Sequence, residues 1–374
     1  MPVARETRPA VIVAVPVPVS LDDDDASGVH AVAALERAVQ DARWGHHDLA
    51  YSARENLAGL HDARYTRRFQ LVATSLDRPG EALGAAFLRL PQVGNTHRAE
   101  LEILVHPDHV GTGADDALVA AAERYAAQQG RRVVGLETEH VGEPAADASD
   151  AVVAPTGSGR VSRSDAAAAL ALRSGFGLEQ AIRYSVLPLP VAAPVLVALR
   201  SAAIDAAGDD YRTVTWAEHC PQEWVEQFAD LEARMSTDAP SAGLDTVADP
   251  WNAARVRAAE DAVRRSGRGR LATAIEHRPT RTLAGVTVVD FPLDRPEVVF
   301  QHDTLVLREH RGHRLGLLAK VVNLEALAGR RPQARRVHTW NAEENSFMLA
   351  INVALGFEPR GVIASWQKHL SSQE

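Results

Sequence analysis

The chain has 374 residues, of which 46% are hydrophobic and 24% charged, and its formal net charge is −9. This length is typical of two globular domains, and the composition gives each of them enough apolar residues for a core. The negative charge argues against a nucleic-acid partner, because proteins that bind phosphate backbones usually carry a basic surface. The chain has no run of 18 apolar residues, so we expect no membrane partner and a cytoplasmic location.

The single cysteine, Cys220, excludes an intramolecular disulfide and a cysteine-based zinc cluster. It follows Glu218 and His219, but a catalytic thiol needs more than neighbours in sequence. We therefore expect a buried thiol without a catalytic role, and we expect no metal cofactor.

Two halves of the chain share one spacing of strand and turn residues. The first half predicts a strand at 71–74 and a second strand at 84–91. The second half predicts strands at 271–274 and 285–292, and in both halves the opening glycine and closing proline of the second strand are seven positions apart. Several equal intervals in the same order indicate an internal repeat.

A third strand in each half, at 101–105 or 298–307, runs into a turn that contains a glycine. Gly111 lies 27 positions after the glycine that opens the second strand of its half, and Gly312 has the same spacing in the second half. This agreement extends the repeat to the turns.

An amphipathic helix is predicted after each turn, and each helix reaches a glycine, Gly130 or Gly329, of the kind that caps a helix C-terminus. A further strand follows at 132–136 or 336–340, and then a last helix that ends in Gly-Phe. These last pairs are Gly175-Phe176 and Gly356-Phe357.

The order of elements predicts, in each half, an α/β (α+β) domain with a mixed, mostly antiparallel sheet and helices on both faces. Residues 142–163 are rich in Ala, Ser, Gly and Pro and predict a mobile surface loop. Prolines then break regular structure before a short Ala-rich helix. We place the domains at 1–190 and 210–374, with a linker at 191–209.

The turn of the second half has features of a pyrophosphate site. It runs from His310 to Gly316 and leads a strand into a helix, whose first N–H groups and dipole favour an anion. Gly312 lets the backbone approach a ligand closely, and Arg311 and Arg314 supply positive charge. A helix start with glycine and arginine is also common as plain structure.

The run Arg311-Gly312-His313-Arg314-Leu315-Gly316 and the closing Gly-Phe resemble the GNAT superfamily of acyl-CoA-dependent N-acyltransferases. Its core motif is Arg/Gln-x-x-Gly-x-Gly/Ala, which Arg311 and Gly316 match at the ends while Arg314 replaces the middle glycine. The stretch 339–357 looks like actinobacterial members with two GNAT repeats, an architecture shared with mycothiol synthase. The resemblance implies two tandem GNAT-like domains, of which the second binds acetyl-CoA.

The resemblance also implies roles for residues of the second half. The backbone around the turn would hold the CoA pyrophosphate, and the strand before it would pair with the pantetheine arm and offer an N–H to the thioester carbonyl. Asn341 and Asn345 would line the cleft where the acyl group and the amine meet. The remaining cofactor-binding candidates are Leu305, Val306, Leu307, Arg311, Gly312, His313, Arg314, Leu315 and Gly316.

One position departs from the family pattern. The family often places a tyrosine five residues before the Gly-Phe phenylalanine, as the acid that protonates the departing thiolate, and here that position is Asn352. An amide donates a hydrogen bond but no proton. A thiol with a pKa of ~8.5 is already a fair leaving group, so catalysis does not require the acid.

The general base stays open at this point. Side chains alternate along a strand, so Gln301 and Asp303 are expected on one face and His302 and Thr304 on the other. We expect Asp303 or His302 to take the proton of the ammonium substrate, with Glu343 or an ordered water as further alternatives.

The first half differs at the same turn, where Val110 replaces the opening arginine and Asp115 the last glycine. Aspartates suit a helix start but would repel a pyrophosphate there. The tyrosine position is Ala171. We expect this half to be structural or to shape the substrate site, although Glu100 and Glu102 keep a second active site open.

We expect an N-acetyltransferase, monomeric or homodimeric, that moves an acetyl group from acetyl-CoA to a primary amine of a small molecule by direct attack. The alternative is an acyl-CoA-binding sensor or partner module without catalysis. Nucleotide binding has less support, because no Walker lysine motif follows either turn. Loop 236–251 is expected to contribute to the acceptor pocket.

Overall fold

The computed structural model describes residues 10–75 and 81–371 of the chain, which form two compact units. The first unit contains the residues up to 182 together with 241–246 and those from 361 onward. The second contains 183–240 and 247–360. Contacts thus divide the chain after Ile182, before the proline-rich segment, and assign its last strand to the first unit.

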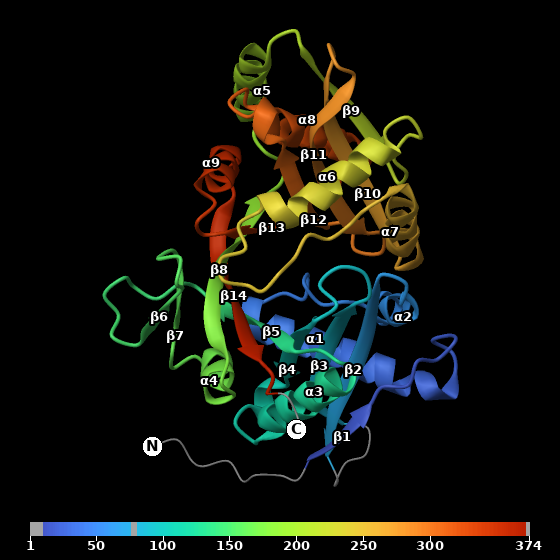
Figure 1. Ribbon diagram of the computed structural model, residues 1–374, viewed down its shortest axis with the longest axis vertical. Coiled ribbons are helices and arrows are strands. Elements are labelled where there is room, and N and C mark those ends of the chain that lie inside the picture. Colours follow the sequence, from blue (N-terminus) through green and yellow to red (C-terminus); the bar gives the residue numbers. More distant parts are fainter. Residues whose placement is uncertain (1–9, 76–80, 372–374) are drawn as a thin grey trace. The chain divides into compact units, whose positions relative to one another are not determined.

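The first unit is a sheet in the order β1-β2-β3-β4-β5-β14, in which only the β4–β5 pair is parallel (Figure 1). Helices α1 and α2 pack on one face of the sheet and α3 on the other. The elements are β1 (Ala10–Ala14), η1 (Asp24–Ala26), α1 (Ser27–Trp44), α2 (Ala53–His61), β2 (Thr66–Ser75), β3 (Ala82–Pro91), β4 (Arg98–Val105), η2 (Pro107–His109), α3 (Ala114–Gln128), β5 (Val133–Val141), β6 (Ala151–Val153), β7 (Arg160–Ser162), α4 (Ala166–Arg173), β8 (Gly177–Pro188) and β14 (Glu358–His369).

The second unit repeats this plan in the order β13-β12-β11-β10-β9, again with one parallel pair, β12–β13. Helices α6 and α7 pack on one face and α5 and α8 on the other. The elements are α5 (Ala193–Ala207), β9 (Tyr211–Ala217), α6 (Val225–Asp238), α7 (Ala253–Arg265), β10 (Arg268–His277), β11 (Thr282–Pro292), β12 (Val298–Val306), η3 (Arg308–His310), α8 (Leu315–Arg330), β13 (Arg336–Ala342) and α9 (Ser346–Leu355).

The repeat predicted from spacing is present residue by residue. Gly84 stands opposite Val105, and Gly285 stands opposite Val306, each residue 201 positions after its counterpart. A bulge precedes the glycine in both units, and α8 also starts 201 positions after α3. The same offset therefore identifies equivalent positions of the two sheets.

The two equivalent glycines are required by close backbone packing. A Cβ at Gly285 would lie 2.5 Å from the carbonyl oxygen of Leu305, and one at Gly84 would lie 2.8 Å from that of Leu104. No L-residue other than glycine fits there unless the neighbouring strand moves.

We expect Gly285→Ala to lower the free energy of unfolding by about 2 kcal/mol, because the added methyl group overpacks the pair of strands. Gly329→Ala is the control, since Gly329 lies in α8 with no atom within 4 Å of its Cβ position. That change should raise stability by roughly 0.5–1 kcal/mol through helix propensity. Urea denaturation of both variants measures the difference, and equal midpoints would contradict the packing argument.

Two predicted features differ in the structure. Residues 142–163 contain a small antiparallel hairpin, β6–β7, because Val161 and the adjoining Ala154 are buried in the first unit's core. Gly329 does not cap α8, which continues to Arg330. The Ala-rich helix expected after the prolines is present as α5, whose apolar side chains pack on α8.

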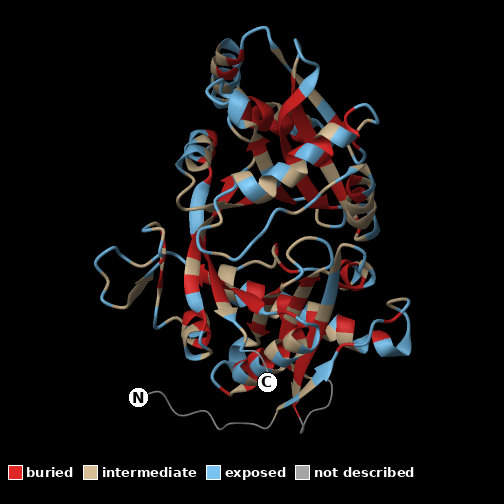
Figure 2. Ribbon diagram, viewed as in Figure 1, coloured by how far each residue is buried: buried red, intermediate tan, exposed pale blue. Residues whose placement is uncertain are grey.

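Buried residues follow the strands in each unit, as Figure 2 shows for the two sheets. Cys220 is 2% exposed, and burial raises the pKa of its thiol to about 12, so it is not a thiolate at neutral pH. Within residues 10–75 and 81–371, no helix combines the length and the apolar character needed to cross a membrane.

Candidate functional site

Strands β12 and β13 separate early in the second unit. Their parallel register runs only from Val298 to Phe300. In the first unit, β4 stays paired with β5 from Arg98 to Glu102, and Glu102 is equivalent to Asp303. The second sheet therefore opens three residues earlier, and the backbone of β12 beyond Phe300 faces this opening without a paired strand in the described part of the chain.

A bulge lies at the point where β12 leaves its neighbour. The register with β11 shifts so that His302 and Asp303 together occupy the place of one residue. Gln301 and Thr304 both hydrogen-bond the Thr287 hydroxyl, at 3.0 and 2.8 Å. The strict alternation expected for these residues is therefore wrong, because the bulge puts Gln301 and Thr304 on one side. Bulges often redirect side chains next to functional sites.

The bulge faces a group of charged side chains on the α6 side of the sheet. Arg270 binds Asp290 through two hydrogen bonds, of 2.7 and 3.0 Å, and His302 Nε2 lies 3.1 Å from Asp290 Oδ2. Burial alone would raise the pKa of Asp290, but Arg270 and His302 lower it well below its usual range. Asp290 is thus a fixed anion that orients the other two side chains.

Two further carboxylates complete this group, and they repel each other. Burial, and after it the charge of Asp303, raises the pKa of Glu232 to about 8. Asp303 has an exposed surface, yet the protein around its carboxylate removes part of the solvation and raises its pKa, against the opposing effects of His302 and Arg270. A carboxylate whose pKa is raised toward neutrality is suited to accept a proton.

The turn after β12 leaves a helix start open. Gly312 and Arg314 both have positive φ, 92° and 53°, which turns the chain into α8. The first hydrogen bond of α8 runs from Leu318 N–H to Arg314 O at 3.0 Å, and no side chain caps the helix. In the described chain, the preceding N–H groups, including that of Gly316, remain available to an anion.

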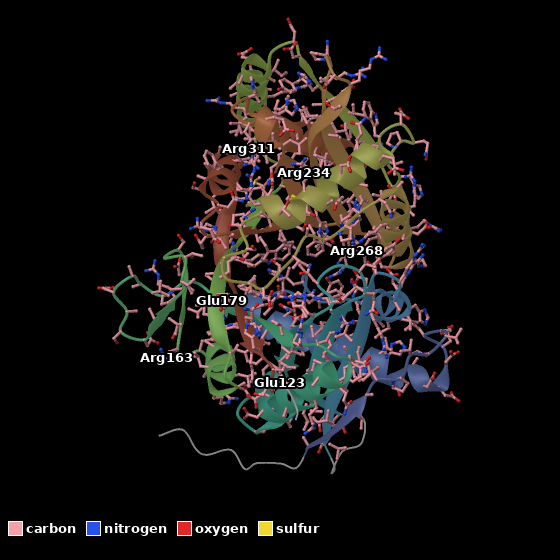
Figure 3. All side chains as sticks on the ribbon, viewed as in Figure 1. Glu123, Arg163, Glu179, Arg234, Arg268 and Arg311 are labelled. Carbon is pink, nitrogen blue, oxygen red and sulfur yellow. The ribbon has the colours of Figure 1, made fainter. Side chains whose placement is uncertain are left out.

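Arg311, labelled in Figure 3, is held beside the end of β12. Its guanidinium donates to Val306 O and to Asp238 Oδ2, both at 3.1 Å, and Arg308 lies 3.4 Å from the same carboxylate. Its backbone N–H donates to Arg308 O at 3.3 Å. The available backbone donors therefore begin after Arg311, and its side chain would have to exchange partners to reach a phosphate.

The asparagines proposed for the site play different parts. Asn352 and Asn341 are in contact, with Asn352 Nδ2 donating to Asn341 Oδ1 at 2.6 Å. Asn345 caps α9, where its Oδ1 accepts from Met348 N–H at 3.2 Å. The carboxylate of Glu343 is bound by both ends of the Arg183 guanidinium, at 2.7 and 2.6 Å, so both of its oxygens already have a partner.

The equivalent helix start in the first unit is filled by the chain itself. Arg173 lies 2.6 Å from the Asp115 carboxylate and 2.7 Å from that of Asp116. Asp115 takes the place of Gly316, and its side chain is largely buried. An ion pair at the start of α3 occupies the position where a phosphate would bind.

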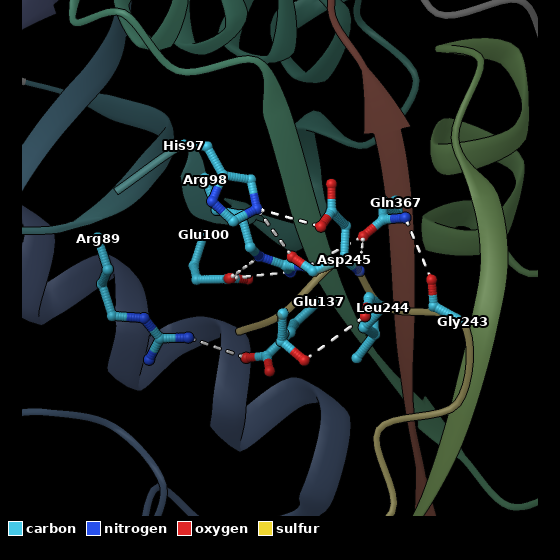
Figure 4. Close-up of polar contacts among 10 residues, drawn as sticks. Arg89, His97, Arg98, Glu100, Glu137, Gly243, Leu244, Asp245 and Gln367 are labelled. Carbon is cyan, nitrogen blue, oxygen red and sulfur yellow. Dashed lines mark hydrogen bonds and ion pairs between the residues drawn. The ribbon is translucent and has the colours of Figure 1, made fainter. Parts of the chain in front are cut away.

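The first unit carries its own charged group on the sheet, shown in part in Figure 4. Arg89 pairs with Glu137 at 3.1 Å, and Arg98 binds Glu100 and the backbone of residue 245. Burial, followed by the charge of Glu139, raises the pKa of Glu102 to about 7. Residues 241–246, from the loop expected to shape an acceptor pocket, thus contact His97, Arg98 and Gln367 of this unit.

Four residues of the second unit were not foreseen from sequence: Glu232, Arg270, Asp290 and Lys320. Asp290 could have been found from the sequence, since it is a charged residue inside the apolar run of β11. Lys320 could have been found in the same way, because it falls within the apolar part of α8. No sequence pattern marks Glu232 and Arg270, since only the fold brings α6 and β10 together.

Residues 30–148 match the model of the family described as Acetyltransferase (GNAT) family. The matched segment lies in the first unit and contains its turn and α3. A search of curated proteins found no match.

Solved structures resemble the chain over its whole length. A tandem GNAT protein from the clavulanic acid biosynthesis pathway, determined without acetyl-CoA, has a TM-score of 0.74 and 26% identity, and the match covers 98% of this chain and 100% of that one. A GCN5-related N-acetyltransferase from Sphaerobacter thermophilus has a TM-score of 0.59 and 15% identity, with 97% of each chain covered, and shares the fold.

Proposed function

The chain contains a GNAT acetyltransferase domain and has the fold of two tandem GNAT repeats, and from this premise we propose that its second unit moves an acetyl group from acetyl-CoA to a primary amine of a small molecule. The observation that carries the proposal is the early separation of β12 and β13 beside the uncapped start of α8. The family match lies on the first unit, where the helix start is closed by Asp115 and Arg173.

The residues present fit the proposed cofactor. The pyrophosphate would bind the N–H groups from Gly312 to Gly316, with Arg314 supplying charge. The pantetheine arm would bind along the unpaired side of residues 305–307, where it would replace the Arg311 guanidinium as the partner of the Val306 backbone. The N–H groups of residues 312–316 follow closely after residues 305–307 in sequence, so one extended ligand can contact both segments.

The reaction asks little more of the protein than orientation and a place for one proton. The amine nitrogen attacks the thioester carbon, the carbon–sulfur bond breaks, and the nitrogen loses a proton as the amide forms. The sulfur leaves as thiolate, which is tolerable because a thiol has a pKa of ~8.5. We assign the proton to the carboxylate pair Asp303 and Glu232, which lies beside the opening.

The test is to incubate the protein with acetyl-CoA and a panel of small primary amines and to follow the release of free thiol. Amine-dependent release supports the enzyme. Tight acetyl-CoA binding without release for any amine would favour the alternative, a non-catalytic acyl-CoA-binding module.

We expect one acetyl-CoA site per chain, because the first unit's helix start is neutralised by its own ion pair. Calorimetric titration measures the stoichiometry. Arg173→Ala should leave it at one, since the remaining aspartates still repel a phosphate. Two comparable sites in the wild-type protein would contradict this assignment of the first unit.

A further inference from the structure

The chain contains lysine at only two positions, 320 and 368, among 40 basic residues. Lys368 pairs with Glu123 at 2.7 Å in the first unit. Lys320 lies on α8 in the second unit, is 2% exposed, and is replaced at the equivalent position of the first unit by Val119, which is also buried. A lysine in this buried position is therefore not required by the fold of the repeat.

Lys320 is the first member of a chain of hydrogen bonds. Its Nζ donates to Asn352 Oδ1 at 2.8 Å, and Asn352 Nδ2 donates to Asn341 Oδ1 at 2.6 Å. Lys320 and Asn352 are buried, whereas Asn341 is half-buried near the end of β13, beyond the last residue paired with β12. The chain thus runs from a buried amine to an amide beside the opening.

The protonated amine fixes the direction of both amides. A lysine ammonium has three donors and no acceptor, so Asn352 must turn its oxygen toward it and its nitrogen toward Asn341. Asn341 then uses its oxygen as the acceptor, so its own N–H groups take no part in this series of hydrogen bonds. A neutral amine can also accept a hydrogen bond, so it permits both amides to reverse.

Loss of solvation lowers the pKa of Lys320 to about 7, and no charged group contributes to this shift. Helix α9, which supplies Asn352, has no titratable side chain, and the Phe357 ring lies 5.6 Å from Nζ. The charged groups of the other elements around α8 have partners other than Lys320: Arg200 with Glu325, Arg212 with Glu276, Asp290 with Arg270 and His302, and His338 with Tyr184.

We propose that Lys320 is a positioning residue, which directs the amides of Asn352 and Asn341 so that Asn341 presents hydrogen-bond donors at the opening between β12 and β13. These donors suit the oxygen or sulfur that gains negative charge during acyl transfer. The role rests on the proposed function. The resembling family often has a proton-donating tyrosine at the position of Asn352. Here Asn352 would orient Asn341 instead, which needs no proton transfer.

The two lysines allow a direct measurement that does not depend on activity. In protein labelled with 13C-lysine, the side chains give two Cε resonances, which Lys320→Met assigns. We expect the Lys320 resonance to titrate near pH 7 and Asn352→Asp to move this midpoint upward by more than one pH unit, because a carboxylate favours the ammonium. An unmoved midpoint in Asn352→Asp would overturn the contact on which the proposal depends.

Kinetics then test the positioning role. We expect Lys320→Met to lower kcat/KM by about tenfold at pH 6 and by much less at pH 9, where wild-type Lys320 is neutral. Lys320→Val, which copies the first unit's residue, controls for packing and should behave alike. A loss that is equal at both pH values would show a merely structural role. Wild-type protein that releases no thiol would overturn the proposed function, whereas the resonances report on the contact separately.

Discussion

Gly316→Asp is expected to lower the affinity for acetyl-CoA by at least ~100-fold while the protein stays folded. The change places in α8 the carboxylate that the first unit has at Asp115, but without the arginine that neutralises it there. A negative charge at the uncapped start of α8 would face the pyrophosphate directly, and a like-charge contact costs several kcal/mol.

The fold should tolerate the change, because the nearest atom to a Cβ at Gly316 would be the end of the Ile351 side chain at 3.4 Å, an ordinary contact distance. An aspartate in the first turn also suits the helix dipole. Gly316→Asn is the matched control, since it has the same shape without the charge and should keep affinity within a few-fold. Calorimetry on the two variants separates charge from size. Equal affinities for Asn and Asp would show that the phosphates bind elsewhere.

The repeat and its elements could be predicted because glycine spacing and apolar periodicity are local properties of the sequence. Glycine is required at positions 84 and 285 by this strand pairing, because a Cβ there would clash with the backbone of the neighbouring strand. The pairing of β14 with β5 could not be predicted, since it joins residues 361–369 to 133–141 across most of the chain.

The site was predictable only in part, for the same reason. The turn around Gly312 could be predicted because its own glycine and arginine residues are typical of an anion site. The bulge at His302 and Asp303 is a property of two strands together, and sequence alternation alone assigned the two residues to opposite faces. The choice of proton acceptor could not be narrowed further without Glu232, whose pKa is raised by Asp303 only because α6 packs against the sheet.

Asp303→Asn is expected to lower the rate of acetyl transfer by ~100-fold or more at neutral pH, the usual scale for loss of a general base. In the wild-type protein the rate should rise with pH through the range near 8, because Glu232 and Asp303 repel each other and the pair gives up its last proton only there. The deficit of the variant should shrink at high pH, where the amine reaches the site already deprotonated.

Glu232→Gln is the matched variant that distinguishes the two carboxylates. It removes the carboxyl group whose pKa is raised to about 8 without removing Asp303, so the rising limb of the pH–rate profile should move to lower pH. Asp261→Asn, an exposed carboxylate of α7 paired with Arg264, controls for a general change of charge. If Glu232→Gln loses as much activity as Asp303→Asn, both carboxylates are needed to accept the proton. A limb that stays near pH 8 in Glu232→Gln would show that it does not come from this pair. If Asp303→Asn keeps full activity at neutral pH and His302→Gln loses it, the base is His302, which the bulge brings to the same charged group.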